Sequence, residues 1–397
     1  MILSKKAQAI APSATLAIDS KAKAMLAEGK SVIGFGAGEP DFDTPSYIRD
    51  AAKAALDAGY TRYTPAAGLP ALRRTICDEL RTRKGLEYQP KQIIISNGAK
   101  HSLYNTFQCI LNPGDEVIIP APYWVSYPEI VKMADGVPVF VNTREEDGFL
   151  LQEDSLLQAI TSRTKAICIC NPCNPTGAFM ERTKLEMIAR IAIDHNLLVV
   201  ADEVYEKLVY SDNPVVSIAT LPAMQERTII INGASKTYAM TGWRIGYAAV
   251  PAPLATVMDA MQSQSTSGPN TMAQHAYMAA LIGPQEESES MREVFKERRD
   301  LIYSLTLDTP YISSIEPEGA FYLMVNVSEL LCRKYKEVRI QSAEQLCSLM
   351  LENKGVAAVP GESFGAPHHI RLSYAISDEN IREGMRRIKT FIRETEA

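Results

Sequence analysis

A series of short apolar runs constrains the fold of this chain more than any other feature. The runs are rich in β-branched residues and lie at 93–95, 116–119, 166–170, 197–201 and 228–231. Runs of this length are typical of strands buried on both faces of a sheet, and helical patterns separate them. The alternation over residues 45–285 predicts an α/β fold with a mainly parallel sheet. In such folds the functional groups gather at the carboxyl ends of the strands.

The C-terminal part of the chain has a different order of elements. It begins near residue 290 with a charged helix, and its further patterns predict strands at 319–325 and 369–374 and helices at 342–353 and 378–395. This order is typical of a smaller α+β domain. A chain of 397 residues is long enough for two domains rather than one.

Composition and charge exclude some classes of partner. The net charge of −6 argues against a general binder of nucleic acid or anionic membranes. The N-terminal residues Met1 to Lys6 lack the apolar core of a signal peptide, and no window approaches the roughly 18 apolar residues of a membrane span. We therefore expect a cytoplasmic protein without nucleic-acid or membrane partners.

Three of the seven cysteines, Cys168, Cys170 and Cys173, lie within six residues and could resemble metal ligands. The first two alternate with Ile167 and Ile169, which places both on one face of the predicted strand. An odd number of cysteines in mostly apolar surroundings also fits reduced core thiols better than a disulfide framework. We expect no metal site here.

A lysine, Lys236, lies where the chain leaves the apolar run 228–231. We expect its amine to be semi-buried, with burial and the nearby cation of Arg244 lowering its pKa toward that of a usable nucleophile. Such an amine can form an imine with a carbonyl, while the hydroxyl of Ser235 and the guanidinium of Arg244 match a phosphate. A carbonyl compound that carries a phosphate describes pyridoxal phosphate. An isolated Ser-Lys pair would more simply be a surface loop, so the interpretation depends on other segments.

Three further segments converge on the same ligand. A strand-to-helix turn through Gly98 presents free N–H groups at a helix N-terminus, which suits a phosphate but is also common in ordinary βαβ units. Trp124 can stack on a flat ring or simply fill the core. Asp202 ends a fully apolar run, and a carboxylate there is costly unless it is paired. We expect its partner to be a protonated ring nitrogen.

Four motifs then occur in a specific order: Asn171 to Gly177 (NPCNPTG), Asp202 to Tyr205 (DEVY), Ser235-Lys236 followed by 242–246 (GWRIG), and Arg371-Leu372-Ser373. With these motifs the chain resembles the class I aminotransferases of fold type I, and it is most similar to the bacterial subgroup of aspartate and prephenate aminotransferases. The resemblance covers essentially the whole chain. It implies a homodimer in which each subunit has a large cofactor-binding domain at 45–285 and a small domain at 286–397. Residues 1–44, with a helical pattern at 13–30, would form an N-terminal arm and part of the small domain.

The resemblance also implies roles for individual residues around pyridoxal 5'-phosphate. Lys236 would hold the cofactor as an imine, Asp202 would pair with the ring nitrogen, and Trp124 would stack on the ring. Asn174 and Tyr205 would bind the ring oxygen. The phosphate would be bound by Gly98, Ala99, Ser235 and Arg244, with Lys100 beside them and Tyr63 reaching in from the partner subunit.

The same resemblance implies how an amino acid is bound. Arg371 would hold the α-carboxylate in a bidentate pair, assisted by Asn174 and the backbone of Gly38, with Trp124 beside it. Lys100 and Thr15 are associated in this subgroup with the distal carboxylate of acidic substrates. The expected activity is therefore ping-pong transfer of an amino group from aspartate or glutamate to a 2-oxo acid.

Other functions remain open at this point. The same residues fit prephenate as a further acceptor, and aromatic or alanine specificity on the same fold is an alternative. A lyase or synthase would share the lysine, the aspartate and the phosphate-binding residues but would release ammonia or a thiol. A ligand-sensing regulator usually carries a DNA-binding domain, for which we expect neither a spare N-terminal segment nor a basic face.

Overall fold

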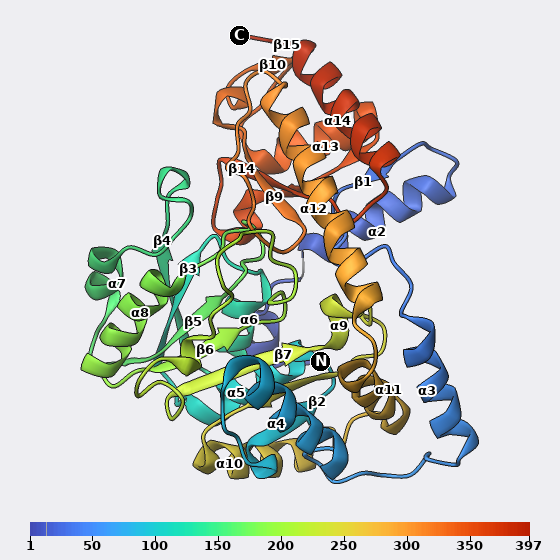
Figure 1. Ribbon diagram of the computed structural model, residues 1–397. Coiled ribbons are helices and arrows are strands. Elements are labelled where there is room, and N and C mark those ends of the chain that lie inside the picture. Colours follow the sequence, from blue (N-terminus) through green and yellow to red (C-terminus); the bar gives the residue numbers. More distant parts are fainter. Residues whose placement is uncertain (13) are drawn as a thin grey trace.

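A seven-stranded sheet forms the centre of the larger lobe of the protein, in a computed structural model that describes residues 1–12 and 14–397 (Figure 1). The strand order is β2-β8-β7-β6-β5-β3-β4, and every neighbouring pair is parallel except the two pairs that involve β8. The α/β class with a mainly parallel sheet is thereby confirmed. Its strands are β2 (Ile93–Ser96), β3 (Glu116–Ala121), β4 (Val137–Asn142), β5 (Thr164–Cys170), β6 (Leu198–Asp202), β7 (Thr228–Gly233) and β8 (Gly246–Ala249).

Helices cover both faces of this sheet. One face packs on α5 (Ala99–Ile110), α6 (Ser126–Met133) and α10 (Ala252–Ser265). The other face packs on two groups of helices: α7 (Glu153–Ala159) with α8 (Arg182–Asp194), and α3 (Ser46–Asp57) with α4 (Pro70–Lys84) and α11 (Thr271–Ile282). Because both faces are covered, the central strands need apolar side chains on both sides, which explains their continuous apolar runs.

The cysteines of β5 follow the predicted alternation. Cys168 and Cys170 are buried with α5 and α6 on one face, and Ile167 and Ile169 are buried with α8 on the other. All seven thiols are free. Within residues 1–12 and 14–397 no group of three or more His, Cys, Asp or Glu side chains could hold a metal ion.

The smaller lobe is built around a three-stranded antiparallel sheet in the order β13-β14-β9. The strands are β9 (Tyr322–Asn326), β13 (Val359–Pro360) and β14 (His369–Ser373), and the main helices are α12 (Glu286–Leu307), α13 (Ala343–Lys354) and α14 (Asp378–Arg393). Short strands complete the lobe: β10 (Lys334–Tyr335), β11 (Val338–Arg339) and β15 (Thr395–Glu396). The predicted elements of this region are therefore present, in the predicted order.

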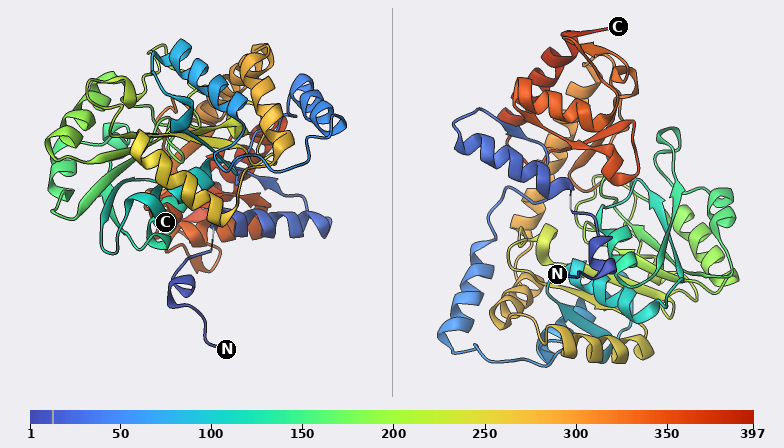
Figure 2. Two further views of the ribbon diagram at one scale, coloured as in Figure 1. Left: turned by 90° about the horizontal axis from the view of Figure 1, so that it is seen from below. Right: turned by 180° about the vertical axis from the view of Figure 1, so that it is seen from behind.

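The N-terminal segment crosses from one lobe to the other. Helix α1 (Lys5–Gln8) lies in an arm that projects from the body (Figure 2), and α2 (Ala14–Ala27) packs beside the smaller lobe. Strand β1 (Ile33–Gly34) then pairs in parallel with β12 (Val356–Ala357). Helix α2 corresponds to the helix predicted at 13–30, of which residue 13 lies outside the described residues. The domain boundaries at 44 and 285 stay a prediction.

None of the helices in the described part of the chain is both long enough and apolar enough to cross a membrane.

Candidate active site

A cleft of about 480 Å³ lies where the carboxyl ends of the central strands face the smaller lobe. It brings together residues predicted from widely separated motifs. These are Thr15, Gly38, Ala99, Lys100, Trp124, Asn174, Asp202, Tyr205, Ser235, Lys236, Arg244 and Arg371. Two predicted residues do not line it. Gly98 lies directly before the lining residue Ala99, and Tyr63 is 96% exposed on a loop of the larger lobe.

The amine of Lys236 has an unusually low proton affinity. The residue lies in α9 (Ala234–Thr237), directly after β7, and its Nζ donates a hydrogen bond to the carbonyl oxygen of Gly38. Burial lowers the pKa of Lys236 to about 8; Arg244 also lowers it, while Glu39 raises it. About a tenth of the amine is therefore neutral at pH 7, far more than for an ordinary lysine, and the neutral form can act as a nucleophile. The predicted effects of burial and of Arg244 are both present.

Asp202 ends β6 as a buried carboxylate. Its Oδ2 accepts a hydrogen bond of 2.7 Å from the hydroxyl of Tyr127, and its Oδ1 accepts one of 3.3 Å from the N–H of Val204. Burial raises the pKa of Asp202 to about 6, although these hydrogen bonds oppose the shift. The carboxylate form would gain from a cation in the cleft, such as a protonated ring nitrogen.

The turn between β2 and α5 forms a cradle with Arg244. Gly98 has φ of +88°, and a Cβ on this residue would lie 2.4 Å from Nη2 of Arg244. A Cβ on Gly246 would lie 2.5 Å from the backbone nitrogen of Ala99. Both positions need glycine, because the guanidinium and strand β8 pack directly against the start of α5. The first N–H groups of α5 have no acceptor within the helix, so this end together with Arg244 and Ser235 suits a phosphate.

Arg371 is a buried guanidinium with only neutral hydrogen-bond acceptors. It is 2% exposed on β14 and donates to Oδ1 of Asn174 at 3.0 Å and to the carbonyl oxygen of Gly36 at 3.1 Å, while its Nε has no partner. The ring centres of Tyr322 and Phe364 lie 4.3 and 5.0 Å from the guanidinium carbon. A buried cation without a carboxylate partner is unfavourable. The fork therefore fits a carboxylate that enters the cleft from solvent.

Lys100 and Trp124 form one wall of the cleft. The Nζ of Lys100 lies 4.8 Å from the centre of the Trp124 ring, and burial, followed by the charge of Arg244, lowers the pKa of Lys100. Thr15 and Lys23, both on α2, line the cleft as well. Helix α2 thus brings the N-terminal segment to a site to which both lobes contribute residues.

Two tyrosines of the site were not identified from the sequence. Tyr127 binds Asp202, and the hydroxyl of Tyr322 lies 2.8 Å from that of Tyr205. The only sequence signals are the aromatic run at 122–128 and a tyrosine within the apolar strand at 319–325. Both hydroxyls meet partners more than 70 residues away in the chain, which no local pattern encodes.

Comparison with known proteins agrees with this geometry. Residues 30–388 match the family model described as aminotransferase class I and II. An aspartate aminotransferase of Geobacillus stearothermophilus is 47% identical over 99% of both chains, and an aspartate/prephenate aminotransferase of Cereibacter sphaeroides is 45% identical over 96% of both. The solved aspartate aminotransferase from Rhizobium meliloti is 38% identical and superimposes with a TM-score of 0.96 over the full length of both chains. Since the match spans both lobes and every motif that lines the cleft, the chain belongs to the aminotransferase class I and II family.

Proposed function

We propose that the protein transfers the amino group of an acidic L-amino acid, aspartate or glutamate, to a 2-oxo acid in a ping-pong cycle, with pyridoxal 5'-phosphate as cofactor. One observation carries the proposal. The partly neutral amine of Lys236 shares a cleft with the buried carboxylate of Asp202 and the buried guanidinium of Arg371. The names of the relatives support the acidic substrate.

The proposed roles follow from the position of each group. When bound, pyridoxal phosphate supplies a ring that accepts electrons from the substrate carbon. Lys236 would hold the cofactor covalently, and its Nζ would remove the proton from the amino-acid Cα and later return a proton. Asp202, held by Tyr127, would keep the ring nitrogen protonated, and Trp124 would support the ring. Asn174 and Tyr205 would bind the ring oxygen.

The substrate is held by groups at two ends of the cleft. Arg371 and Asn174, with the backbone of Gly38, bind the α-carboxylate, so that Cα lies next to Lys236. Lys100, which lies across the cleft on α5, and Thr15 bind the distal carboxylate. Gly98, Ala99, Ser235 and Arg244, at and near the start of α5, would hold the phosphate of the cofactor.

The decisive experiment measures a panel of amino donors against 2-oxoglutarate and oxaloacetate and records the visible absorbance of the purified protein. We expect a yellow protein that prefers aspartate and glutamate and needs a second oxo acid for continued turnover. Release of ammonia or a thiol without an acceptor would indicate a lyase instead. Prephenate belongs in the same panel, since two-carboxylate acceptors fit the same residues and some relatives carry its name.

Lys100→Ala should reduce the preference for aspartate over alanine. The variant removes a cation near the proposed distal carboxylate, and a charge-assisted hydrogen bond contributes about 1.5–3 kcal/mol. We therefore expect the ratio of kcat/KM for the two amino acids to fall by roughly 10-fold or more. The variant Lys100→Arg, which keeps the charge, is the control. An unchanged ratio in Lys100→Ala would remove Lys100 from the substrate site.

We further propose that the protein acts as a homodimer in the cytoplasm. Tyr63 is 96% exposed in the single chain, which suits a side chain that binds the cofactor phosphate of the partner subunit. Free cysteines throughout fit a reducing compartment.

Tyr63→Phe should then weaken cofactor binding without changing the assembly, because it deletes only one hydroxyl. We expect the Kd for pyridoxal phosphate to rise by roughly 10-fold or more, as for loss of one hydrogen bond to a charged group. Equilibrium dialysis gives the Kd, and light scattering gives the mass of the assembly. A monomeric wild-type protein with full activity would contradict the dimer.

A further inference from the structure

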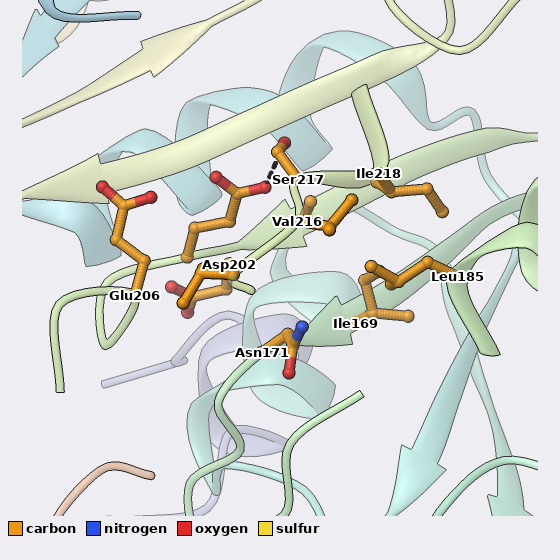
Figure 3. Close-up of a pocket in the computed structure, with 11 residues that line it drawn as sticks. Ile169, Asn171, Leu185, Asp202, Glu206, Val216, Ser217 and Ile218 are labelled. Atoms are coloured by element: carbon orange, nitrogen blue, oxygen red, sulfur yellow. Dashed lines mark hydrogen bonds between the residues drawn. The ribbon is translucent and has the colours of Figure 1, made fainter. Parts of the chain in front are cut away.

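A cluster of buried charges lies directly behind the proposed cofactor site. Lys84, the last residue of α4, lies between Glu203 and Glu206, which follow β6. Its Nζ lies 2.5 Å from Oε2 of Glu203 and also contacts Glu206. The three side chains are only 8 to 12% exposed. Ser217 donates a further hydrogen bond of 2.5 Å to Glu203 (Figure 3).

The turn after β6 presents two different faces. Asp202 and Tyr205 line the cleft, whereas Glu203 and Glu206 bind Lys84 on the opposite side. Figure 3 shows the carboxylate of Asp202 pointing away from the side chains of Glu206 and Ser217. The backbone of the turn is compact, because the N–H of Glu206 donates to the carbonyl oxygen of Glu203 at 3.0 Å. The two glutamates and the two residues that line the cleft therefore belong to one short, hydrogen-bonded turn.

We propose that Lys84 is a positioning residue of the cofactor site: by binding Glu203 and Glu206 it fixes the turn that presents Asp202 and Tyr205 to the ring. The inference rests on the proposed function, since it assumes that these two residues contact pyridoxal phosphate. It concerns Lys84 itself, which does not line the cleft.

Electrostatics explain why a cation is needed at this position. Two buried carboxylates three residues apart repel each other, and burial raises the pKa of Glu203. Lys84 opposes that shift, and despite burial it helps to hold the pKa of Glu206 below its usual value. Glu79, paired with Lys207 at 3.4 Å and Arg83 at 3.2 Å, completes a cluster in which three cations balance three carboxylates.

The balance of charge between Lys84 and Glu203 also affects the pKa of Asp202. After burial and its two hydrogen bonds, the charge of Glu203 is the next influence on the pKa of Asp202, and it raises that pKa; Lys236 acts in the opposite direction. The other titratable groups coupled to Asp202 are Tyr127, Cys168, Cys170 and Cys173. None of these thiols or hydroxyls supplies a positive charge. By balancing the charge of Glu203, Lys84 therefore favours the ionised form of Asp202, which is the form that would pair with the ring nitrogen.

The test compares Lys84→Met with a matched variant in the smaller lobe. Arg299→Met removes a cation that is equally buried, 8% exposed, and bound to Asp300 and Glu316, but that does not line the cleft. For Lys84→Met we expect the Kd for pyridoxal phosphate to rise by about 10-fold or more, as for loss of a group that orients a ligand-binding residue. The pH at which the visible absorbance of the bound cofactor is half changed should also move, because Asp202 and Tyr205 are the residues proposed to bind its ring nitrogen and ring oxygen. Arg299→Met should lower the Tm but leave both quantities unchanged, and Lys84→Arg should restore both.

Two outcomes would overturn the inference. In the first, Lys84→Met lowers the Tm as Arg299→Met does but keeps the wild-type Kd and pH midpoint, which means that Lys84 serves stability alone. If Lys84→Met does not fold, the variant Lys84→Met/Glu203→Gln/Glu206→Gln replaces it, because it leaves no unpaired charge. The second outcome that would overturn the inference is a wild-type Kd for pyridoxal phosphate in that variant. A wild-type protein that takes up no pyridoxal phosphate would instead refute the proposed function, and this inference with it.

Discussion

Lys236→Ala is expected to abolish nearly all transamination. Proton transfer by a positioned group contributes about 10²–10⁴ in rate, so kcat should fall by at least that factor. The residue is suited to the role because burial lowers the pKa of its amine to about 8, close to neutrality. The measurement is kcat for aspartate with 2-oxoglutarate, together with the visible spectrum.

The same variant should still bind the cofactor, but only noncovalently. The cradle formed by the start of α5 and Arg244 does not include the amine of Lys236. Borohydride should therefore fix pyridoxal phosphate to the wild-type protein and not to the variant. Lys132→Ala, which changes a partly exposed lysine on α6, is the control and should behave as the wild type. Substantial turnover by Lys236→Ala would refute the assigned role.

Arg371→Ala is expected to raise the KM for every amino acid and 2-oxo acid. A bidentate pair with the α-carboxylate consists of two charge-assisted hydrogen bonds of about 1.5–3 kcal/mol each, which corresponds to a roughly 10²- to 10⁴-fold loss of binding. The structure supports the role because Nε of this buried guanidinium has no partner and its other contacts are neutral.

A second variant at position 371 separates the contribution of the positive charge to substrate binding from that of the planar guanidinium. Arg371→Lys keeps a cation but loses the planar fork, so we expect a KM between those of the wild type and Arg371→Ala. Affinity for pyridoxal phosphate should change little in either variant, because the phosphate cradle lies on the other side of the cleft. An unchanged KM in Arg371→Ala would show that another residue binds the α-carboxylate.

The sequence predicts the strands of this protein unevenly, for physical reasons. β2, β5, β6 and β7 are apolar on both faces and were all identified. β8 (Gly246–Ala249) has no β-branched residue, and it is a strand because β2 and β7 pair with it on both sides. β4 is an edge strand that contains Pro138 and leaves much of its surface exposed. Neither β4 nor β8 was predicted.

The residues of the candidate site likewise divide into those that the sequence identifies and those that it does not. Residues at strand ends or in motifs, such as Asp202, Lys236 and Arg371, were identified because their positions follow from the strand pattern or from the family resemblance. Tyr127 and Lys84 were not, because their partners lie 75 and 119 residues away in the chain. Residues that position a reactive residue from elsewhere in the chain are brought to it by tertiary packing alone, so no local sequence pattern identifies them.

The reversed direction of β8 has a practical consequence for altering this protein. Because β8 runs against its neighbours, its first residue rather than its last lies beside the cleft, and one short connection from Gly233 to Gly246 carries both Lys236 and Arg244. Insertions in that connection should be poorly tolerated. Connections at the opposite ends of the strands, such as the exposed turn at His195 and Asn196 between α8 and β6, are better places for a tag or a fluorescent label.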